Sequence, residues 1–455
     1  MPSSPSPSPG PSRVVPGRVS EIGTGFLRDS VTSFATRILC LGIGFFQAAL
    51  TARILLPEGK GELAAALVIP QLFAMLAPLG INFACTYHLG QKTFDRQAVI
   101  RNALTALVLL GAVGMVGSII AGHFLKSTIL QGVPSTAFVL ATLTIPTQIG
   151  MLILLALFRG EMRIWETNLF DLVRAMAMFG LIMLFLLPLQ MGVTGVILAQ
   201  FLAEAGVTLW AIRRFGGGAL PAVRWNVLRS MLEYGLQVYS FSILLYLNYR
   251  LDMFLVRSWL DLTQTGLYAA AVSVAEIMWI IPFSLGNVLF PSTASSSGPS
   301  RDLLTLAVCR RSFYVMLVLC GILAISRNLV IRILFGSAFL GAAPALLWLL
   351  PGILSMSVQN VVGSDLTGRG RALPVTVGAV LGLVTNVILN ILWIPRYGIL
   401  GASLASSVSY TLVTIVVLAA FVRLTRSKLR DALVLRREDL RALSRLVLRS
   451  GEAAA

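Results

Sequence analysis

The chain has 455 residues, of which 56% are hydrophobic and only 12% are charged, and its mean hydropathy is +0.85. Because a soluble domain carries about 25% charged residues, this composition excludes an ordinary soluble protein and indicates a membrane protein. Taken alone, the formal net charge of +17 suggests a protein that binds nucleic acid, but the sequence contains no recognisable module that reads the grooves of DNA or RNA. We instead expect the cations to lie in short loops and a tail that face anionic lipid headgroups.

The first part of the chain, residues 1–25, is rich in Pro and Ser and is expected to be a disordered cytoplasmic tail. Twelve apolar stretches follow, each near the ~20 residues that a helix needs to cross a bilayer. They lie at 31–51, 62–88, 98–122, 134–158, 166–188, 191–212, 231–256, 264–290, 304–325, 342–363, 372–394 and 398–422.

These stretches divide the chain into two halves. We expect an N-terminal lobe at 26–215 with the first six spans, a cytoplasmic linker at 216–230, and a C-terminal lobe at 231–422 with the last six. A basic cytoplasmic tail at 423–455 completes the chain. In this tail, leucines and arginines recur on different faces of a helix at about 424–449, which predicts an amphipathic helix on the cytoplasmic leaflet. The alternative is a solvated tail.

An internal repeat supports the division into halves. Gly61 and the alanines after it recur at Gly266 about 205 residues later, and each copy follows an apolar run that ends in an arginine, Arg53 or Arg257. A duplicated bundle is the expected build of a transporter whose halves rock against each other. The predicted fold is therefore an all-α integral membrane protein with twelve transmembrane helices in two six-helix lobes, related by an internal repeat around a central cavity.

The distribution of positive charge predicts the orientation. Most of the 36 Lys and Arg residues fall on the cytoplasmic side if both termini lie there, as the positive-inside rule requires. We therefore expect a multi-pass protein of the cytoplasmic membrane with both termini inside.

The sequence gives little support to enzymatic chemistry. The four cysteines are scattered, only two histidines occur, and neither accompanies an acidic cluster at the spacing of metal ligands. There is no phosphate-binding loop of the Walker type. We expect no enzyme activity, no cofactor and no metal.

Ionisable residues within the apolar stretches are the candidate functional residues, because each costs at least ~2.5 kcal/mol at the bilayer centre. Neither Arg37 nor Arg250 has a sufficient partner on its own helix, so we expect both to face one aqueous cavity that holds an anion. The alternative is a salt bridge between helices, such as Arg37 with Glu276 or Glu204. Asp171 and Arg174 stand three residues apart and are expected to neutralise each other. The predicted cavity residues are Arg37, Arg250, Asp252, Glu276, Asn248 and Gln47.

Several motifs taken together resemble the polysaccharide flippases of the multidrug/oligosaccharidyl-lipid/polysaccharide exporter superfamily. The first-half motif lies at residues 52–61, where Leu56 replaces the usual glycine, and the second-half motifs include Arg250-x-Asp252 and residues 266–271. The resemblance covers about residues 25–422 and implies two six-helix lobes around a V-shaped cavity. It also implies movement of polyprenyl-diphosphate-linked saccharides from the cytoplasmic to the outer leaflet of a bacterial inner membrane.

The resemblance and the basic tail define the expected partners, which are the lipid-linked saccharide, anionic membrane lipids, and a polysaccharide polymerase or glycosyltransferases. Two alternatives stay open. One is a cation-coupled multidrug antiporter of the same fold, with Asp171, Asp252 or Glu276 as the cation site. The other is a membrane scaffold that does not transport and recruits biosynthetic enzymes through its basic tail.

Overall fold

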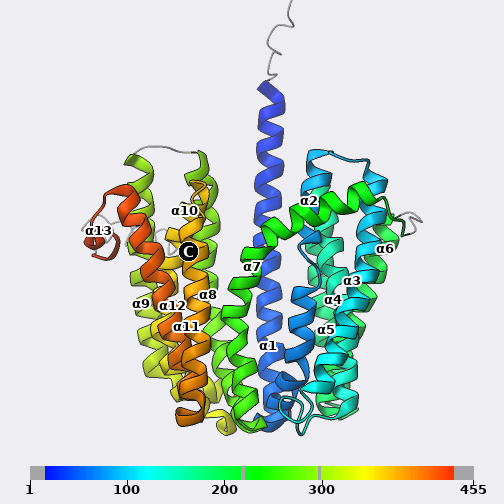
Figure 1. The fold of residues 1–455 in the computed structure, drawn as a ribbon, viewed down its shortest axis with the longest axis vertical. Coiled ribbons are helices and arrows are strands. Elements are labelled where there is room, and N and C mark those ends of the chain that lie inside the picture. The colour runs from blue at the N-terminus through cyan, green and yellow to red at the C-terminus, as the bar shows by residue number, and fades with distance from the viewer. Residues whose placement is uncertain (1–15, 217–220, 296–298, 435–455) are drawn as a thin grey trace, which may run out of the picture.

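The computed structural model describes residues 16–216, 221–295 and 299–434, which form helices joined by short turns, with no strand in these ranges (Figure 1). The helices of the first half are α1 (Pro16–Leu76), α2 (Ile81–Gln91), α3 (Arg96–Phe124), α4 (Ser135–Gly160), α5 (Ile164–Leu186) and α6 (Gly192–Gly216). Those of the second half are α7 (Trp225–Trp259), α8 (Leu262–Ser295), α9 (Pro299–Phe335), a short 3-10 helix (Ser337–Phe339), α10 (Ala342–Gly368), α11 (Leu373–Tyr397), α12 (Ile399–Thr425) and α13 (Leu429–Leu433).

Ten segments of the described chain are long and apolar enough to cross a membrane. The first, Thr32–Gln91, holds two of the expected spans, because the helix breaks at Leu56 (φ 59°, ψ 177°). Pro57 causes this break, since it has no amide N–H to donate and pushes the preceding residue out of the helical region. Helix α7 is not among the ten. The chain is a multi-pass helical membrane protein, and the number of twelve spans stays a prediction.

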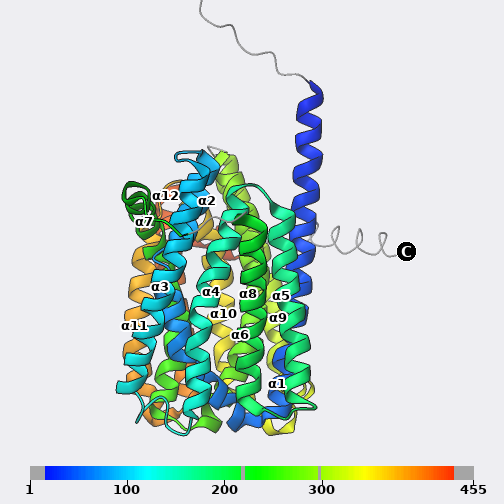
Figure 2. The ribbon, with the colours of Figure 1, turned by 90° about the vertical axis from the view of Figure 1, so that its right-hand side faces the viewer.

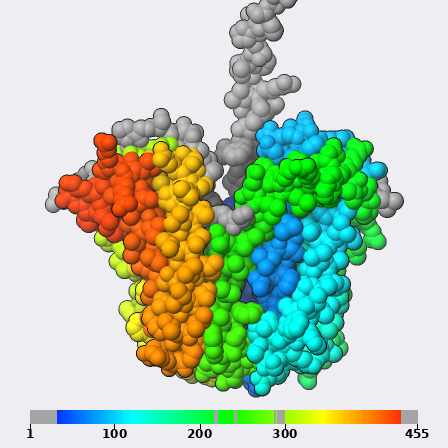
Figure 3. Space-filling model, in the orientation of Figure 1, coloured from blue at the N-terminus to red at the C-terminus, as the bar shows by residue number. Residues whose placement is uncertain are grey.

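The helices form two lobes with a cleft between them. Helices α2 to α6 and the second part of α1 lie on one side, and α8 to α12 lie on the other, with α7 between them (Figure 1), and the two groups overlap in the view turned by 90° (Figure 2). The first lobe packs around side chains such as Val99 and Ile149, and the second around Tyr268 and Phe339. The space-filling view is hollowed between the lobes at the end where α7 begins and α12 ends (Figure 3). The cleft is therefore open at one end of the bundle only.

Helix α7 belongs to both lobes. Met231 packs in the hydrophobic cluster of the first lobe, and the ring of Tyr234 stacks on Tyr87 of α2 with 4.2 Å between the ring centroids. The hydroxyl of Tyr239 donates a hydrogen bond to the carbonyl oxygen of Met75 at the end of α1. We expected the second lobe to begin at Met231, but the apolar and aromatic face of α7 up to Tyr239 packs with the first lobe instead.

The closed end of the cleft is sealed by two glycines that are equivalent in the repeat. A Cβ atom on Gly61 of α1 would overlap the carbonyl oxygen of Leu262, and one on Gly266 of α8 would overlap that of Pro57. Only glycine allows two helix backbones to come this close. The small-residue motif found twice in the sequence therefore forms the contact between the two halves.

Two arginines extend this seal on either side. Arg53, before the break in α1, donates from Nε to the carbonyl oxygen of Leu334 in α9 at 3.1 Å. Arg257, at the end of α7, donates to the carbonyl oxygens of Gln131 in the first lobe and Leu260 at 2.9 Å. Each arginine thus reaches from its own lobe to a backbone carbonyl of the other. Both lie just beyond the ends of the expected spans 31–51 and 231–256.

The N-terminal prediction was wrong in part. Helix α1 begins at Pro16, so residues 16–25 are helical where we expected disorder, and the remaining residues, 1–15, lie outside the described part.

The C-terminal helix is interrupted. Helix α12 ends at Thr425, and Arg426 takes a left-handed conformation with φ 54°. A right-handed helix cannot continue through a residue in this conformation. The short α13 then packs against α9, where Ala432 is fully buried and Arg310 donates to the carbonyl oxygen of Asp431 at 2.5 Å. A single helix through about 424–449 is therefore wrong at this break, and residues 435–455 of the predicted helix and tail lie outside the described part.

Candidate functional site

Two cavities of different size lie between the lobes. The larger, about 890 Å³, is lined by α1, the end of α4, α5 and α8. The smaller, about 230 Å³, is lined by α1, α7 and α8. They share no lining residue, and each takes residues from both lobes. The cleft therefore offers two separate binding environments.

The larger cavity gathers three arginines around one carboxylate. Arg37 of α1, Arg159 of α4 and Arg174 of α5 line it together with Asp171, which interacts electrostatically with all three. Within the described ranges, none of the three guanidinium groups lies within 4.0 Å of a carboxylate. The expected pair of Asp171 with Arg174 is thus not formed at that distance. The surplus of positive charge suits an anion.

Arg37 connects this cavity to the second lobe. Its guanidinium lies over the ring of Phe283 in α8, 5.5 Å from the centroid, a cation–π contact across the cleft. Asn168 of α5 donates to the hydroxyl of Ser33 in α1 at 3.0 Å and holds the two helices of the cavity wall together. The salt bridges that we considered for Arg37 are not formed, because both carboxylates have other partners: Arg250 pairs with Glu276, and Gln200 and Thr147 donate to Glu204 at 3.1 Å each.

Apolar side chains border the same cavity on the outside of the bundle. Phe34, Ile38 and Leu41 of α1 line it and are 62%, 54% and 40% exposed. The arginine cluster therefore lies directly beside exposed apolar side chains, an arrangement that suits a ligand with an anionic head and an apolar chain.

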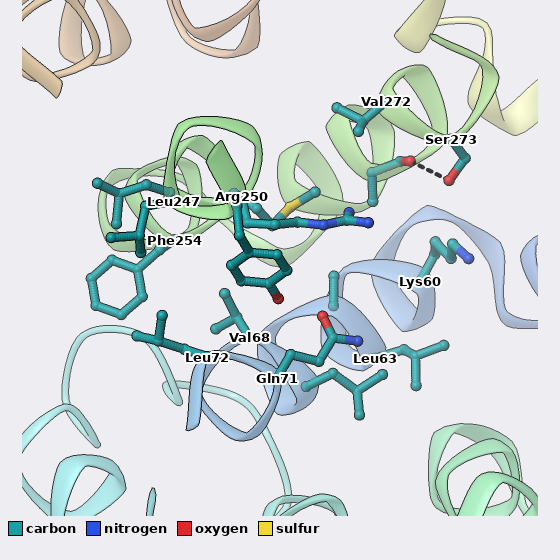
Figure 4. A pocket seen from close by; sticks show the side chains of 16 residues that line it. Lys60, Leu63, Val68, Gln71, Leu72, Leu247, Arg250, Phe254, Val272 and Ser273 are labelled. Carbon is teal, nitrogen blue, oxygen red and sulfur yellow. Dashed lines mark hydrogen bonds between the residues drawn. The ribbon is translucent and has the colours of Figure 1, made fainter. Parts of the chain in front are cut away.

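The smaller cavity contains Arg250, whose guanidinium extends from α7 toward the side where Lys60 and Ser273 lie (Figure 4). Its Nη1 atom is 3.0 Å from Oε1 of Glu276, so the partner that its own helix lacks comes from α8. This side chain is still 43% exposed. Gln71 of α1 adds an amide to the lining.

We expected Arg37 and Arg250 to face one shared cavity, but they line two. Arg37 stands 19 residues before the break at Leu56, which is about 28 Å along a helix and toward the open end. Arg250 lies only seven residues before Arg257, which takes part in the seal. The long first helix thus separates the two cations along the cleft, which apolar periodicity alone did not indicate.

Asp252 and Asn248 lie inside the second lobe and line neither cavity. Asp252 is 3% exposed and accepts hydrogen bonds from the hydroxyl of Tyr268 at 2.5 Å and of Ser406 at 3.3 Å. Asn248, 2% exposed, accepts from Ser409 at 3.1 Å. The two stand four residues apart, on the helix face opposite the cavity, and join α7 to α8 and α12. Their predicted role in substrate binding is not supported by this position.

Gln47 also lies outside both cavities. Its side-chain amide donates to the carbonyl oxygen of Ala175 at 3.1 Å and joins α1 to α5. This contact is structural.

Sequence reasoning missed Lys60 as a cavity residue, because it lies between the expected spans 31–51 and 62–88. In the structure it begins a helix face that lines the smaller cavity, at positions 60, 63, 64, 67, 68, 71 and 72. This is the i, i+3, i+4 spacing of one helical face. The spacing was visible in the sequence, but the second expected span was taken to begin only at residue 62.

The described residues include no group of three or more His, Cys, Asp or Glu side chains that could hold a metal ion. The four cysteines are free thiols, three of them buried.

Two helical lobes around a cleft define the transporter fold of the multidrug/oligosaccharidyl-lipid/polysaccharide exporter superfamily. The structure is similar to the lipid II flippase MurJ in an inward closed conformation, with a TM-score of 0.69 and 14% identity over 89% of each chain. It is also similar to an inward-facing multidrug resistance transporter of the MATE family, with a TM-score of 0.62 and 16% identity over 86% of this chain and 94% of the other. At these identities the likeness shows the fold alone.

The profile of a family described as polysaccharide biosynthesis protein matches residues 50–344, and the chain belongs to this family. It is 25% identical to the "Probable low-salt glycan biosynthesis flippase Agl15" of Haloferax volcanii, over 57% of this chain and 56% of the relative. It is 24% identical to the "Succinoglycan biosynthesis transport protein ExoT" of Rhizobium meliloti, over 55% of this chain and 50% of the relative. The chain thus matches about half the length of these curated relatives.

Proposed function

We propose that the protein is a flippase for lipid-linked saccharides. It moves polyprenyl-diphosphate-bound saccharides from the cytoplasmic to the outer leaflet by alternating access and so supplies polysaccharide biosynthesis. Membership in the polysaccharide biosynthesis family and the names of the relatives, a glycan biosynthesis flippase and a succinoglycan transport protein, support this substrate class. It is a transporter and not an enzyme.

The observation that carries the proposal is the larger cavity. A diphosphate headgroup cannot cross ~30 Å of hydrocarbon unaided, and guanidinium groups replace its hydration by paired hydrogen bonds to phosphate oxygens. Arg37, Arg159 and Arg174 supply three such groups around the single carboxylate of Asp171. The exposed apolar side chains beside them leave the polyprenyl chain in the bilayer while the head occupies the cavity.

The orientation is part of the proposal. With both termini in the cytoplasm of an inner membrane, as the distribution of Lys and Arg favours, the open end of the cleft faces the cytoplasm and the Gly61 to Gly266 seal lies on the outer side. The arginine cluster is then accessible from the leaflet in which lipid-linked saccharides are made. Rocking of the two lobes would open the seal and release the headgroup outside.

Flipping in proteoliposomes tests the proposal. Vesicles that contain the purified protein and a polyprenyl-diphosphate-linked saccharide are assayed for the amount of saccharide that reaches the opposite leaflet. We expect Arg37→Ala and Arg174→Ala each to lower the initial rate at least ten-fold at normal protein abundance, and the lysine variants to recover it in part. Arg229→Ala is the matched control, because Arg229 pairs with Glu233 on the exposed surface of α7. Wild-type rates in both cavity variants would contradict the proposal.

The same vesicles distinguish the alternatives. A cation-coupled antiporter would export a cationic dye down an imposed ion gradient, and Asp252→Asn would abolish that export, since Asp252 is a deeply buried carboxylate. A scaffold would move neither lipid nor dye. Either result would replace the flippase proposal, and the expected polymerase or glycosyltransferase partners would then need to be sought by co-purification.

A further inference from the structure

The smaller cavity lies directly beside the seal. Its walls are residues 60–72 of α1, 246–254 of α7 and 269–273 of α8 (Figure 4). Lys60, at its edge, immediately precedes Gly61, which packs against Gly266. A headgroup that enters from the open end meets this cavity last, at the deepest point of the cleft.

The cavity holds one positive charge that the protein does not neutralise. Arg250 is paired with Glu276 at 3.0 Å. The ammonium group of Lys60 has no carboxylate within 4.0 Å among the described residues. Glu58 and Glu62 stand two positions away on either side and therefore project from other faces of the helix. A cation without a partner is costly in a membrane-spanning region and marks a ligand pathway.

The remaining polar groups suit a sugar. Gln71 offers a side-chain amide, Tyr246 a hydroxyl and an aromatic face, and Ser273 an acceptor oxygen, since its own proton goes to the carbonyl of Ala269 at 2.7 Å. The volume of about 230 Å³ lies below the ~300–1,000 Å³ of typical small-molecule sites. The cavity therefore accommodates one sugar unit and not a whole oligosaccharide.

The two cavities divide the charges of the cargo between them. The diphosphate needs only one cationic site, and the larger cavity provides it with three arginines. A second site with a single free ammonium, hydroxyl-binding groups and room for one ring matches a sugar that carries a carboxylate. We propose that the smaller cavity binds an acidic sugar residue of the headgroup and that Lys60 determines this specificity. The inference rests on the proposed function.

Two lipid substrates that differ in one group test this inference. Polyprenyl-diphosphate-linked oligosaccharides, long enough to reach from Arg37 to Lys60, are prepared with a terminal glucuronate or a terminal glucose, and each is assayed in proteoliposomes with the full-length protein. We expect the wild-type protein to flip the glucuronate lipid several-fold faster. Lys60→Gln should lower the glucuronate rate at least ten-fold and leave the glucose rate within two-fold, and Lys60→Arg should retain the preference because it retains the charge.

The control is Lys126→Gln, which removes an exposed lysine that lines neither cavity and should leave both rates unchanged. An equal fall of both rates in Lys60→Gln overturns the inference, because it assigns Lys60 to the diphosphate or to the seal. A wild-type protein without preference for glucuronate overturns it as well. If the wild-type protein flips neither lipid, the proposed function fails and the inference fails with it. A fall confined to the glucuronate lipid supports both.

Discussion

Arg53 and Arg257 occupy equivalent positions in the two halves and do the same thing in different surroundings. Arg53 donates to two backbone carbonyls of the opposite lobe at the closed end of the cleft, and Arg257 donates to one of the opposite lobe and one of its own. Arg257 is 5% exposed, whereas Arg53 is exposed. Hydrogen bonds to a charged group are stronger where water is excluded. The repeat thus gives two arginine contacts across the closed end, here called locks, and we expect the buried one to be the stronger.

The largest effect should come from a change that breaks both locks at once. Gly266→Leu places a side chain where the carbonyl oxygen of Pro57 lies, so the closed end cannot form and both arginines lose their acceptors. We expect flipping to fall more than ten-fold and thiol reagents added outside to reach cysteines introduced in the cleft. Gly206→Leu is the control, because no atom of a neighbouring element lies within 4 Å of its Cβ position. Normal flipping by the Gly266 variant would show that this contact is not part of the transport cycle.

Removing the buried lock should have the next largest effect. Arg257→Ala removes the charged hydrogen bond to Gln131 that crosses the closed end, and such a bond is worth about 1.5–3 kcal/mol, so the population of the closed state should fall about ten-fold or more. Spin labels beside the break in α1 and at the start of α8 report this population as a distance distribution. A distribution identical to wild type would indicate that the glycine contact alone holds the outer end closed.

Removing the exposed lock should have a smaller effect. Arg53→Ala deletes a contact that competes with water, and exposed charged contacts contribute about 0–1 kcal/mol. We expect less than about a five-fold change in the same distance distribution. If Arg53→Ala opens the outer end as much as Arg257→Ala does, then burial does not set the difference between the two halves.

The smallest effect on transport should come from the C-terminal tail, which lies at the opposite end of the bundle from both locks. Truncation after Arg426 removes α13 and leaves Arg310 without the carbonyl of Asp431, whereas truncation after Val434 keeps both. We expect the shorter chain to be less abundant and to unfold at a lower temperature, with flipping per molecule within two-fold of wild type for both. A loss of flipping at normal abundance would assign the tail a role in gating.

The sequence predicted the membrane-spanning class and the two-lobed repeat. It found Gly61 and Gly266, and Arg53 and Arg257, as repeated pairs, because repetition is a property of the sequence alone. It did not predict that each of these four residues contacts the opposite half, since contact across a cleft depends on tertiary structure. For the same reason Arg250 was recognised as a cation without a partner on its helix, while its actual partner, Glu276, required the packing of α7 on α8.

The break at Leu56 explains the remaining errors. The expected spans ended at residue 51 and resumed at residue 62, so Lys60 fell between them, and Arg37 was placed in the same cavity as Arg250 because neither has a sufficient partner on its own helix. In the structure the helix resumes directly after Pro57, which brings Lys60 into the cleft and leaves Arg37 far along the preceding helix. The pattern of apolar residues did not show whether the first helix ends near Leu56 or only bends there.

The contact of Gly61 with Gly266 has a consequence for the history of the chain. Equivalent residues of two copies touch each other only on the axis that relates them, so an unfused ancestor would have closed the same end as a symmetric dimer, one glycine against its own copy. Such a dimer carries every off-axis charge twice. A single chain is free of that constraint, and here the counterpart of Lys60 in the second half is Thr265, which is fully buried. A single chain can therefore present one unpaired cation to a headgroup that is itself asymmetric, and a homodimer cannot.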